Sequence, residues 1–313
     1  MVRLALAAAL LLGGCGDGEA PDAAVPDIVP EAALEAAPGP PRPAPTALDS
    51  TDLLRENRAA DSVIAMERIT WAKQQRLDTL PTGALMAAIG RTFVGTPYVP
   101  QTLELEGPER LILNLRALDC VTFVENVLAL ARTVKTGGGF AEFTRELQRI
   151  RYRTGEIDGY PSRLHYFSEW ISANAQKGLV EDVTRQLGGQ PDRGPLDFMS
   201  RNRQAYRQLA DAAAFRGIRV VERRLAEQSR YWIPKAEIAG LAEGIRDGDI
   251  IAATSSLAGL DVAHTGLAIW VDGQLHLMHA PLVGDSVEIS DRSLAERIQR
   301  IPRQDGIMVA RPR

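Results

Sequence analysis

The stretch that decides the fold reads Asp119-Cys120-Val-Thr-Phe-Val124. Asp119 is a residue type that caps helix N-termini, and the apolar residues after it recur at helical spacing as far as Ala131. Three glycines at 137–139 then end the predicted helix. The sulfur of Cys120 would therefore lie beside the unpaired N–H groups of the first turn, which favour a thiolate. A buried and inert cysteine is the alternative interpretation.

Three of the four histidines lie in the C-terminal part of the chain. His264 begins one apolar run and His279 ends the next, and the turn signal Asp272-Gly273 between them predicts a hairpin. Antiparallel pairing about this turn places His264 and His279 roughly opposite each other. His276 is an odd number of positions from His279 and so faces the other side of its strand. A cysteine at a helix start that faces two paired histidines is the arrangement of a thiol hydrolase.

The rest of the pattern predicts a single α+β domain over residues 50–313, with no internal repeat. Helical spacing dominates residues 50–93, and residues 140–215 are expected to be mostly helical. From residue 218 the period changes to that of strands, with a hairpin pair expected first and a meander after it, turning at Asp272-Gly273 and Gly284-Asp285. The expected strands are 218–220, 231–233, 250–254, 264–271, 275–280, 287–289 and 307–310.

The first fifteen residues have the pattern of a bacterial lipoprotein signal. The basic residue Arg3 precedes an apolar run over 4–12, which is far shorter than the roughly 20 residues that span a bilayer. Leu12-Gly-Gly-Cys15 resembles a lipobox, in which the cysteine receives a diacylglycerol and becomes the mature N-terminus. We therefore expect residues 1–15 to be a signal peptide with lipidation at Cys15. A plain secretory signal is the alternative.

Residues 16–49 have the composition of a disordered tether. Eight of the 19 prolines lie in this segment, among alanines and acidic residues. Its seven acidic residues outnumber its single arginine, so the chain's net charge of -4 belongs largely to the tether. The folded domain is then close to neutral, which disfavours electrostatic binding to nucleic acid. Two cysteines in 313 residues also exclude a disulfide scaffold.

From residue 95 to its end, the chain resembles the NlpC-type papain-like cell-wall hydrolases. The run Gly95-Thr-Pro-Tyr-Val99 resembles the first motif of that family. Asp119-Cys120-Val-Thr-Phe-Val resembles their Asp-Cys-Ser-Gly-Phe-Val helix start, with Val-Thr in place of Ser-Gly. Gly248-Asp-Ile-Ile251, the run from His264 to Trp270, and Met278-His-Ala280 are similar to the strands that carry the base and the third triad member.

Further motifs are similar to the N-acetylmuramoyl-L-alanine amidase-like branch of that superfamily. These are Asn114-Leu115 with the cysteine helix, Arg163-Leu-His-Tyr166, and the run from Gly259 to Gly266. The resemblance implies a papain-like fold in which N-terminal helices pack on an antiparallel sheet, with extra helices inserted between the cysteine helix and the sheet. It also implies a peptidoglycan hydrolase that cuts the amide between N-acetylmuramic acid and L-alanine, without a cofactor or a metal.

The same resemblance assigns roles to individual residues. Cys120 would be the nucleophile, His264 the base and His279 the residue that orients the base. Tyr98 and the backbone N–H of Cys120 would stabilise the oxyanion. The expected substrate-binding residues are Asp119, Arg163, His165 and Asp261. Arg163 and His165 are expected to line a sugar-binding groove. Each of the four also has a structural interpretation: Asp119 as a helix cap, Arg163 and His165 as side chains of a surface helix, and Asp261 as a turn residue.

Three other functions remain open at this stage. An NlpC-type D,L-endopeptidase would cut the stem peptide after D-glutamate, and a non-catalytic protein would only bind wall fragments. A zinc amidase would need three ligands, but no His-Glu-x-x-His motif is present. The expected partners are peptidoglycan or muropeptide fragments and, through Cys15, a membrane, but not nucleic acid. We expect the chain on the periplasmic face of the envelope, at the outer membrane of a Gram-negative bacterium. The oligomeric state cannot be predicted.

Overall fold

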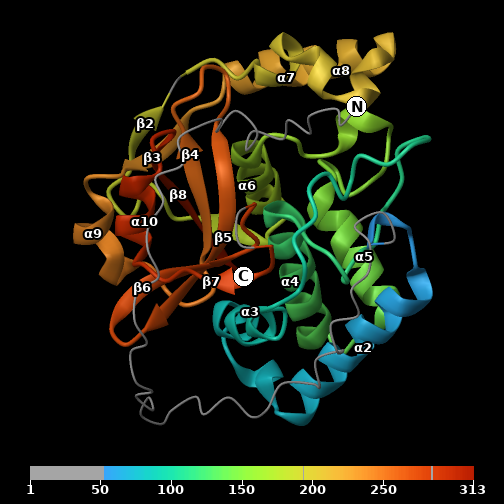
Figure 1. The fold of residues 1–313 in the computed structure, drawn as a ribbon, viewed down its shortest axis with the longest axis vertical. Helices are drawn as coiled ribbons and strands as arrows, with labels where there is room; N and C mark the ends of the chain where they lie inside the picture. The colour runs from blue at the N-terminus through green and yellow to red at the C-terminus, as the bar shows by residue number, and fades with distance from the viewer. Residues whose placement is uncertain (1–52, 193, 283–284) are drawn as a thin grey trace.

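The computed structural model describes residues 53–192, 194–282 and 285–313 (Figure 1). The predicted signal peptide with Cys15, the predicted tether over 16–49 and Gly284 lie outside the described residues. Among the described residues, no helix is both long and apolar enough to cross a membrane. The architecture is α+β, as predicted, with helices packed on an antiparallel sheet (Figure 1).

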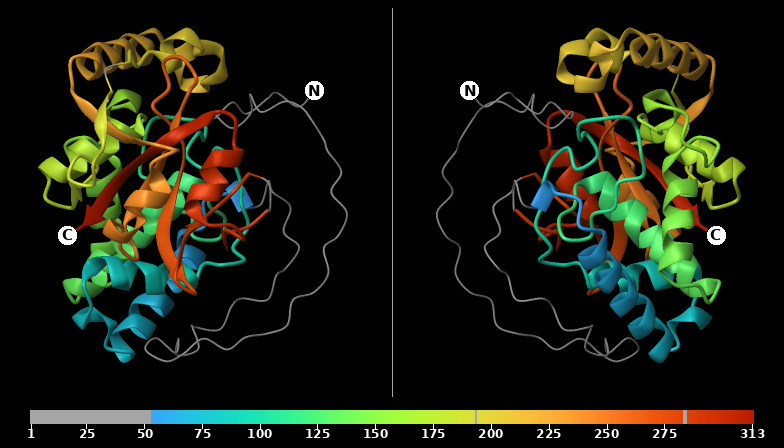
Figure 2. Two further views of the ribbon diagram at one scale, coloured as in Figure 1. Left: turned by 90° about the vertical axis from the view of Figure 1, so that its left-hand side faces the viewer. Right: turned by 90° about the vertical axis from the view of Figure 1, so that its right-hand side faces the viewer.

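Among the described residues, five helices from α2 to α6 pack on one face of the sheet, and four helices from α7 to α10 lie elsewhere. The first group is α2 (Arg58–Gln74), α3 (Thr82–Arg91), α4 (Cys120–Lys135), α5 (Phe140–Arg151) and α6 (Phe167–Gln176). The second group is α7 (Phe198–Arg201), α8 (Ala212–Ala226), α9 (Ile238–Leu241) and α10 (Leu294–Arg300). In both views of Figure 2, α7 and α8 cap one end of the molecule.

The central helix α4 begins and ends where the sequence predicted. The Asp119 side chain accepts from Thr122 N at 2.8 Å, and Thr122 Oγ1 accepts from Asp119 N at 2.9 Å, which forms a capping box. The helix ends at Lys135, directly before the three glycines. Most of its side chains are buried, because α2, α3, α5 and the sheet all pack around it. Cys120 is therefore the first residue of a helix whose position is fixed by packing against three other helices and the sheet.

The sheet runs in the order β2-β3-β8-β4-β5-β6-β7, with β1 paired to β8. Its strands are β1 (Val180–Asp182), β2 (Gln190–Asp192), β3 (Arg230–Pro234), β4 (Ile250–Ser255), β5 (Val262–Val271), β6 (Gln274–His279), β7 (Glu288–Ile289) and β8 (Gln304–Pro312). The predicted meander is confirmed for β4 to β7. Asp272 and Gly273 have φ of 49° and 75°, as a tight hairpin turn requires. β8 leaves the meander and pairs with the far edge of β4.

The two faces of the sheet support separate cores. Leu267 and Ile269 of β5 face the large apolar cluster formed with α2 to α6. Ala268, which lies between them, faces a second cluster that includes side chains of α9 and α10. Alternation along the strand therefore gives apolar burial on both sides, so β5 is fixed in position by helices above and below.

The predicted strand at 218–220 was wrong, because these residues belong to α8. Ile218, Val221 and Leu225 are buried at steps of three and four, whereas Val220 is 55% exposed. The β-branched residues resemble a strand locally, but the helical face is the one that a third apolar cluster buries. Residues 231–233 do form a strand, β3, which pairs with β2 and β8. The strands β1 and β2 and the helix α10 were not predicted.

Candidate active site

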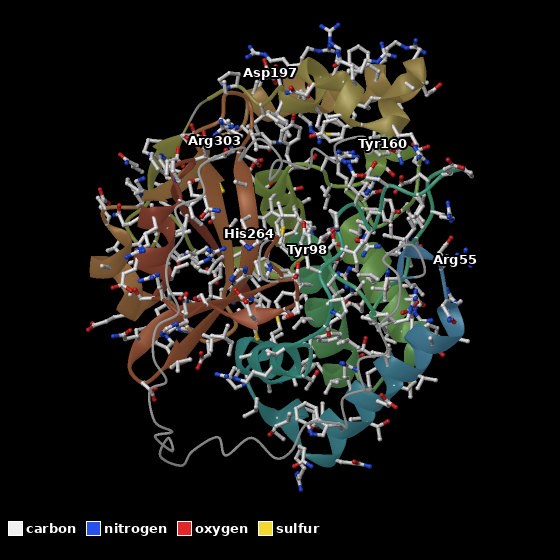
Figure 3. The ribbon with its side chains drawn as sticks, viewed as in Figure 1. Arg55, Tyr98, Tyr160, Asp197, His264 and Arg303 are labelled. Carbon is white, nitrogen blue, oxygen red and sulfur yellow. The ribbon has the colours of Figure 1, made fainter. Side chains whose placement is uncertain are left out.

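A loop carries the chain from α3 to α4 along the free edge of the sheet. Residues 95–98 lie beyond β7, and Tyr98 N donates to Asp285 O at 2.8 Å. Leu118 N donates in turn to Pro97 O at 3.0 Å, and α4 begins two residues later. The backbone hydrogen bonds of this loop therefore extend the sheet edge as far as the start of the cysteine helix. In Figure 3, Tyr98 and His264 are labelled near the centre of the view, where α4 approaches the sheet.

Cys120 meets β5 at the residue that follows His264. Burial, aided by the charge of Asp119, raises the pKa of its thiol to about 12. The backbone N–H groups of Thr265, Val121 and Cys120 lower that pKa, which places the sulfur near Thr265 of β5. The desolvation of the sulfur therefore outweighs the effect of the helix N-terminus and favours the neutral thiol over the predicted thiolate.

His264 and His279 meet as the hairpin predicted. His264 Nε2 lies 2.9 Å from His279 Nδ1, and the two rings are perpendicular. The register pairs Leu267 with Met278, so His279 lies opposite Gly266, and His264 is its diagonal neighbour on the same face. His276 turns away, with Nδ1 placed 2.8 Å from Ser290 O. The parity argument that preferred His279 over His276 is confirmed.

Both imidazoles are neutral near pH 7. Burial lowers the pKa of His264 to about 3, and the positive charge of Arg297 contributes to the shift. Burial also lowers the pKa of His279, with smaller contributions from His264 and Arg297. Because Nε2 of His264 contacts His279, Nδ1 is the nitrogen of His264 that is left to accept a proton.

Tyr98 lies close enough to Cys120 and Asp119 for their charges to act on it. Burial is the main effect that raises the pKa of its hydroxyl, and the two neighbouring groups raise it further. The Tyr98 hydroxyl therefore stays protonated and can donate a hydrogen bond. Its position is compatible with the predicted oxyanion role, which remains a prediction.

Asp119 and Asp261, two of the predicted substrate-binding residues, are held by the fold and lie near the site. Asp119 caps α4 and also accepts from Thr102 Oγ1 at 2.9 Å. Asp261 is buried and accepts from Ser168 N at 2.7 Å. It also lines a cavity of about 260 Å³ beside the loop between β4 and β5. Contact of either residue with substrate remains a prediction.

Arg163 and His165 make their contacts inside the protein. Arg163 is buried, with Nη2 placed 2.7 Å from Glu104 Oε1 and Nε placed 3.2 Å from Glu109 Oε1. His165 Nε2 lies 2.8 Å from Tyr160 O, and burial lowers its pKa well below the ordinary value. These contacts explain both residues without a ligand. Their predicted contact with substrate remains untested.

Sequence reasoning missed two charged residues near the histidines. Glu288 is the register partner of His279 across β6 and β7, and its Oε1 lies 3.7 Å from His279 Nε2. Arg297 reaches the same region from α10, and its charge acts on both imidazoles. A correct register for the 279–288 hairpin was the only signal that could have found Glu288 in the sequence. Within the three described ranges, no group of three or more His, Cys, Asp or Glu residues is placed to hold a metal ion.

Residues 88–307 match the family of N-acetylmuramoyl-L-alanine amidase-like (AmiA-like) proteins. The match includes Tyr98, Cys120, His264 and His279. The chain belongs to this family. It is therefore one of the amidase-like peptidoglycan hydrolases, and its family implies a peptidoglycan-related substrate.

Solved structures agree with the family. An N-acetylmuramoyl-L-alanine amidase from Bacteroides uniformis is 38% identical, with a TM-score of 0.72, and the alignment covers 74% of this chain and 99% of that one. A Bacteroides fragilis protein that carries the name of a xylanase is also 38% identical, with a TM-score of 0.67 and coverage of 71% and 98%. A Legionella pneumophila protein shares the fold at 21% identity, with a TM-score of 0.57 and coverage of 82% and 97%. No curated protein matches the chain.

Proposed function

We propose that this member of the amidase-like family cuts the amide bond between N-acetylmuramic acid and L-alanine by a cysteine mechanism on a papain-like fold of the NlpC type. The observation that carries the proposal is the contact set around β5. His264 and His279 share a 2.9 Å contact, and the sulfur of Cys120 lies near the backbone of Thr265, one residue beyond His264. A nucleophile, a base and a group that orients the base are the three parts that such catalysis needs.

Because Cys120 and His264 are both neutral at rest, the first step includes transfer of the thiol proton. As the sulfur of Cys120 attacks the lactyl carbonyl carbon, Nδ1 of His264 takes the thiol proton. The oxyanion that forms accepts hydrogen bonds from the backbone N–H of Cys120 and the hydroxyl of Tyr98. The protonated His264 is stabilised by His279, whose Nδ1 accepts a hydrogen bond from Nε2–H of His264.

The second half of the reaction releases the two products in turn. When the tetrahedral intermediate collapses, the C–N bond breaks and His264 returns its proton to the leaving amine, which departs as a peptide beginning with L-alanine. A thioester then links Cys120 to the sugar-bearing lactyl group. His264 takes a proton from the water that attacks the thioester. The C–S bond then breaks, His264 returns that proton to the sulfur of Cys120, and the lactyl group leaves as a free acid that ionises in solution.

The remaining parts of the proposal concern location. A diacylglycerol on Cys15 would hold the domain at the membrane, because each buried methylene contributes about 0.8 kcal/mol. The Pro-rich segment over 16–49 would let the domain reach the wall from the periplasmic face. Metabolic labelling with an alkyne fatty acid tests this. Label in the wild-type chain and its absence in Cys15→Ala support the anchor, whereas equal labelling contradicts it.

Mass spectrometry of a defined muropeptide after incubation with the protein tests the bond. The proposal predicts a free peptide that begins with L-alanine and a sugar with a free lactyl carboxylate. A released muramoyl-dipeptide would instead show a D,L-endopeptidase. Recovery of the intact muropeptide after binding would show a protein that only binds wall fragments.

A further inference from the structure

We propose that Glu288 is a positioning residue that fixes the tautomer of His279 and, through it, the tautomer of His264. The inference rests on the proposed function and adds a fourth member to the site. It begins with His279, which is 1% exposed. Its Nδ1 contacts His264, but its Nε2 is buried without a hydrogen-bond partner among the described residues. A buried ring nitrogen without a partner is costly, so some group is expected to satisfy it.

Glu288 is placed to be that group. It is paired with His279 in the register of β6 and β7, and directly opposite side chains lie on one face of the sheet. Glu288 Oε1 is 3.7 Å from His279 Nε2, which is longer than a hydrogen bond. The Glu288 side chain is 43% exposed, and we infer that a modest change of its rotamer brings the carboxylate within hydrogen-bond range of Nε2.

Arg297 is the competing group. It approaches from α10, its charge lowers the pKa of both imidazoles, and its own Nε is buried with no hydrogen-bond partner in the part of the chain that the structure describes. The titratable groups that face His279 are Glu288, Arg297 and the neutral His264, and Asp291 acts in turn on Arg297 and Glu288. A guanidinium can only donate, and a carboxylate can only accept. A hydrogen bond to Glu288 therefore requires a proton on Nε2 of His279, whereas a hydrogen bond from Arg297 requires Nε2 to be unprotonated.

The choice between them decides whether His264 can act as a base. If Glu288 accepts a hydrogen bond from Nε2–H of His279, then Nδ1 of His279 carries a lone pair and accepts a hydrogen bond from Nε2–H of His264. Nδ1 of His264 is then unprotonated and can take the thiol proton of Cys120. If Arg297 donates to Nε2 instead, His279 donates from Nδ1, and His264 presents an N–H to the sulfur. Only the Glu288 arrangement gives a productive site.

Nitrogen NMR of the resting protein tests this without any substrate. With only four histidines in the chain, ¹⁵N-labelled histidine gives a tractable spectrum, in which His276 is an internal reference because its Nδ1 contacts Ser290 O. The inference predicts Nε2–H tautomers for His264 and His279, and a mixture of tautomers in Glu288→Ala. Glu227→Ala removes an exposed carboxylate from the end of α8 and should leave the spectrum unchanged. An Nδ1–H tautomer of His279 in the wild-type protein, or no change in Glu288→Ala, overturns the inference.

Kinetics on the muropeptide provide a second measurement, which would not change in this way if Glu288 only stabilised the fold. Glu288→Ala should lower kcat by about tenfold to a hundredfold, the usual effect of removing a partner that orients a functional histidine, with little change in KM. Glu288→Gln should recover most of the activity, because its amide oxygen still accepts. In a His279→Asn background the loss of Glu288 should have no further effect, since the Asn oxygen accepts from His264 by itself. An equal loss in both backgrounds contradicts the inference. Correct tautomers in a protein that cuts no muropeptide would contradict the proposed function alone.

Discussion

Replacing Gly266 with alanine should damage the site through a backbone contact rather than through any reacting group. A Cβ at this position would lie 2.6 Å from Met278 O, 2.9 Å from His279 Cβ and 3.0 Å from Leu277 Cδ1. The first two atoms cannot rotate away, so β6 must move from β5 by roughly half an ångström to restore ordinary contacts. Overpacking of this kind typically costs about 1–3 kcal/mol of stability.

The same displacement acts on the two histidines. Their 2.9 Å contact joins β5 to β6, so a shift of that size moves it beyond the range of a good hydrogen bond. We therefore expect kcat to fall at least tenfold, along with a lower urea midpoint. Gly240→Ala is the matched control, because nothing lies within 4 Å of its added Cβ, and it should change neither quantity for the worse. A Gly266→Ala protein with lower stability but wild-type kcat would refute the link between strand spacing and catalysis.

Three further predictions follow from burial and charge. The rate of Cys120 alkylation by iodoacetamide, measured by peptide mass spectrometry, should rise about tenfold per pH unit above pH 7. The reason is that the pKa of its thiol is about 12, so the reactive thiolate is scarce throughout this range. A rate that reaches a plateau below about pH 8 would contradict this. The folded state resists protonation of His264, whose pKa is about 3, so the free energy of unfolding should fall as pH drops from about 6.5 to about 3. In His264→Gln, the free energy of unfolding from urea titrations should fall less steeply over this range, by about 1.4 kcal/mol per pH unit, and an equal slope in both proteins would contradict this. Arg151 is 2% exposed and pairs with Glu125 at 2.7 Å, so Arg151→Met should cost about 3–5 kcal/mol in urea unfolding, and adding Glu125→Leu should recover most of it.

The central elements could be predicted because their signals are local. The capping residue Asp119, the apolar spacing and the three glycines define α4 without help from the rest of the chain. Alternation and a two-residue turn define β5 and β6, and parity alone separates His279 from His276. These signals brought together the groups for which we propose a catalytic role.

The features that the sequence did not reveal depend on contacts between segments that are far apart in the chain. Residues 218–220 look like a strand, and only the cluster that buries one face of α8 makes them helical. The pKa of Cys120 is set by burial against β5, which no pattern near residue 120 reports. The contacts that Arg163 makes with Glu104 and Glu109 likewise join distant segments. The predicted contact of Arg163 and His165 with substrate stays a prediction.

Cys120→Ala tests the central claim most directly. The variant keeps the helix start, since Asp119 and Thr122 form the cap, so the fold should be retained. Incubated with a defined muropeptide, it should release no peptide that begins with L-alanine, while calorimetry shows binding close to that of the wild-type protein. Peptide release at the wild-type rate would contradict the claim that Cys120 is the nucleophile.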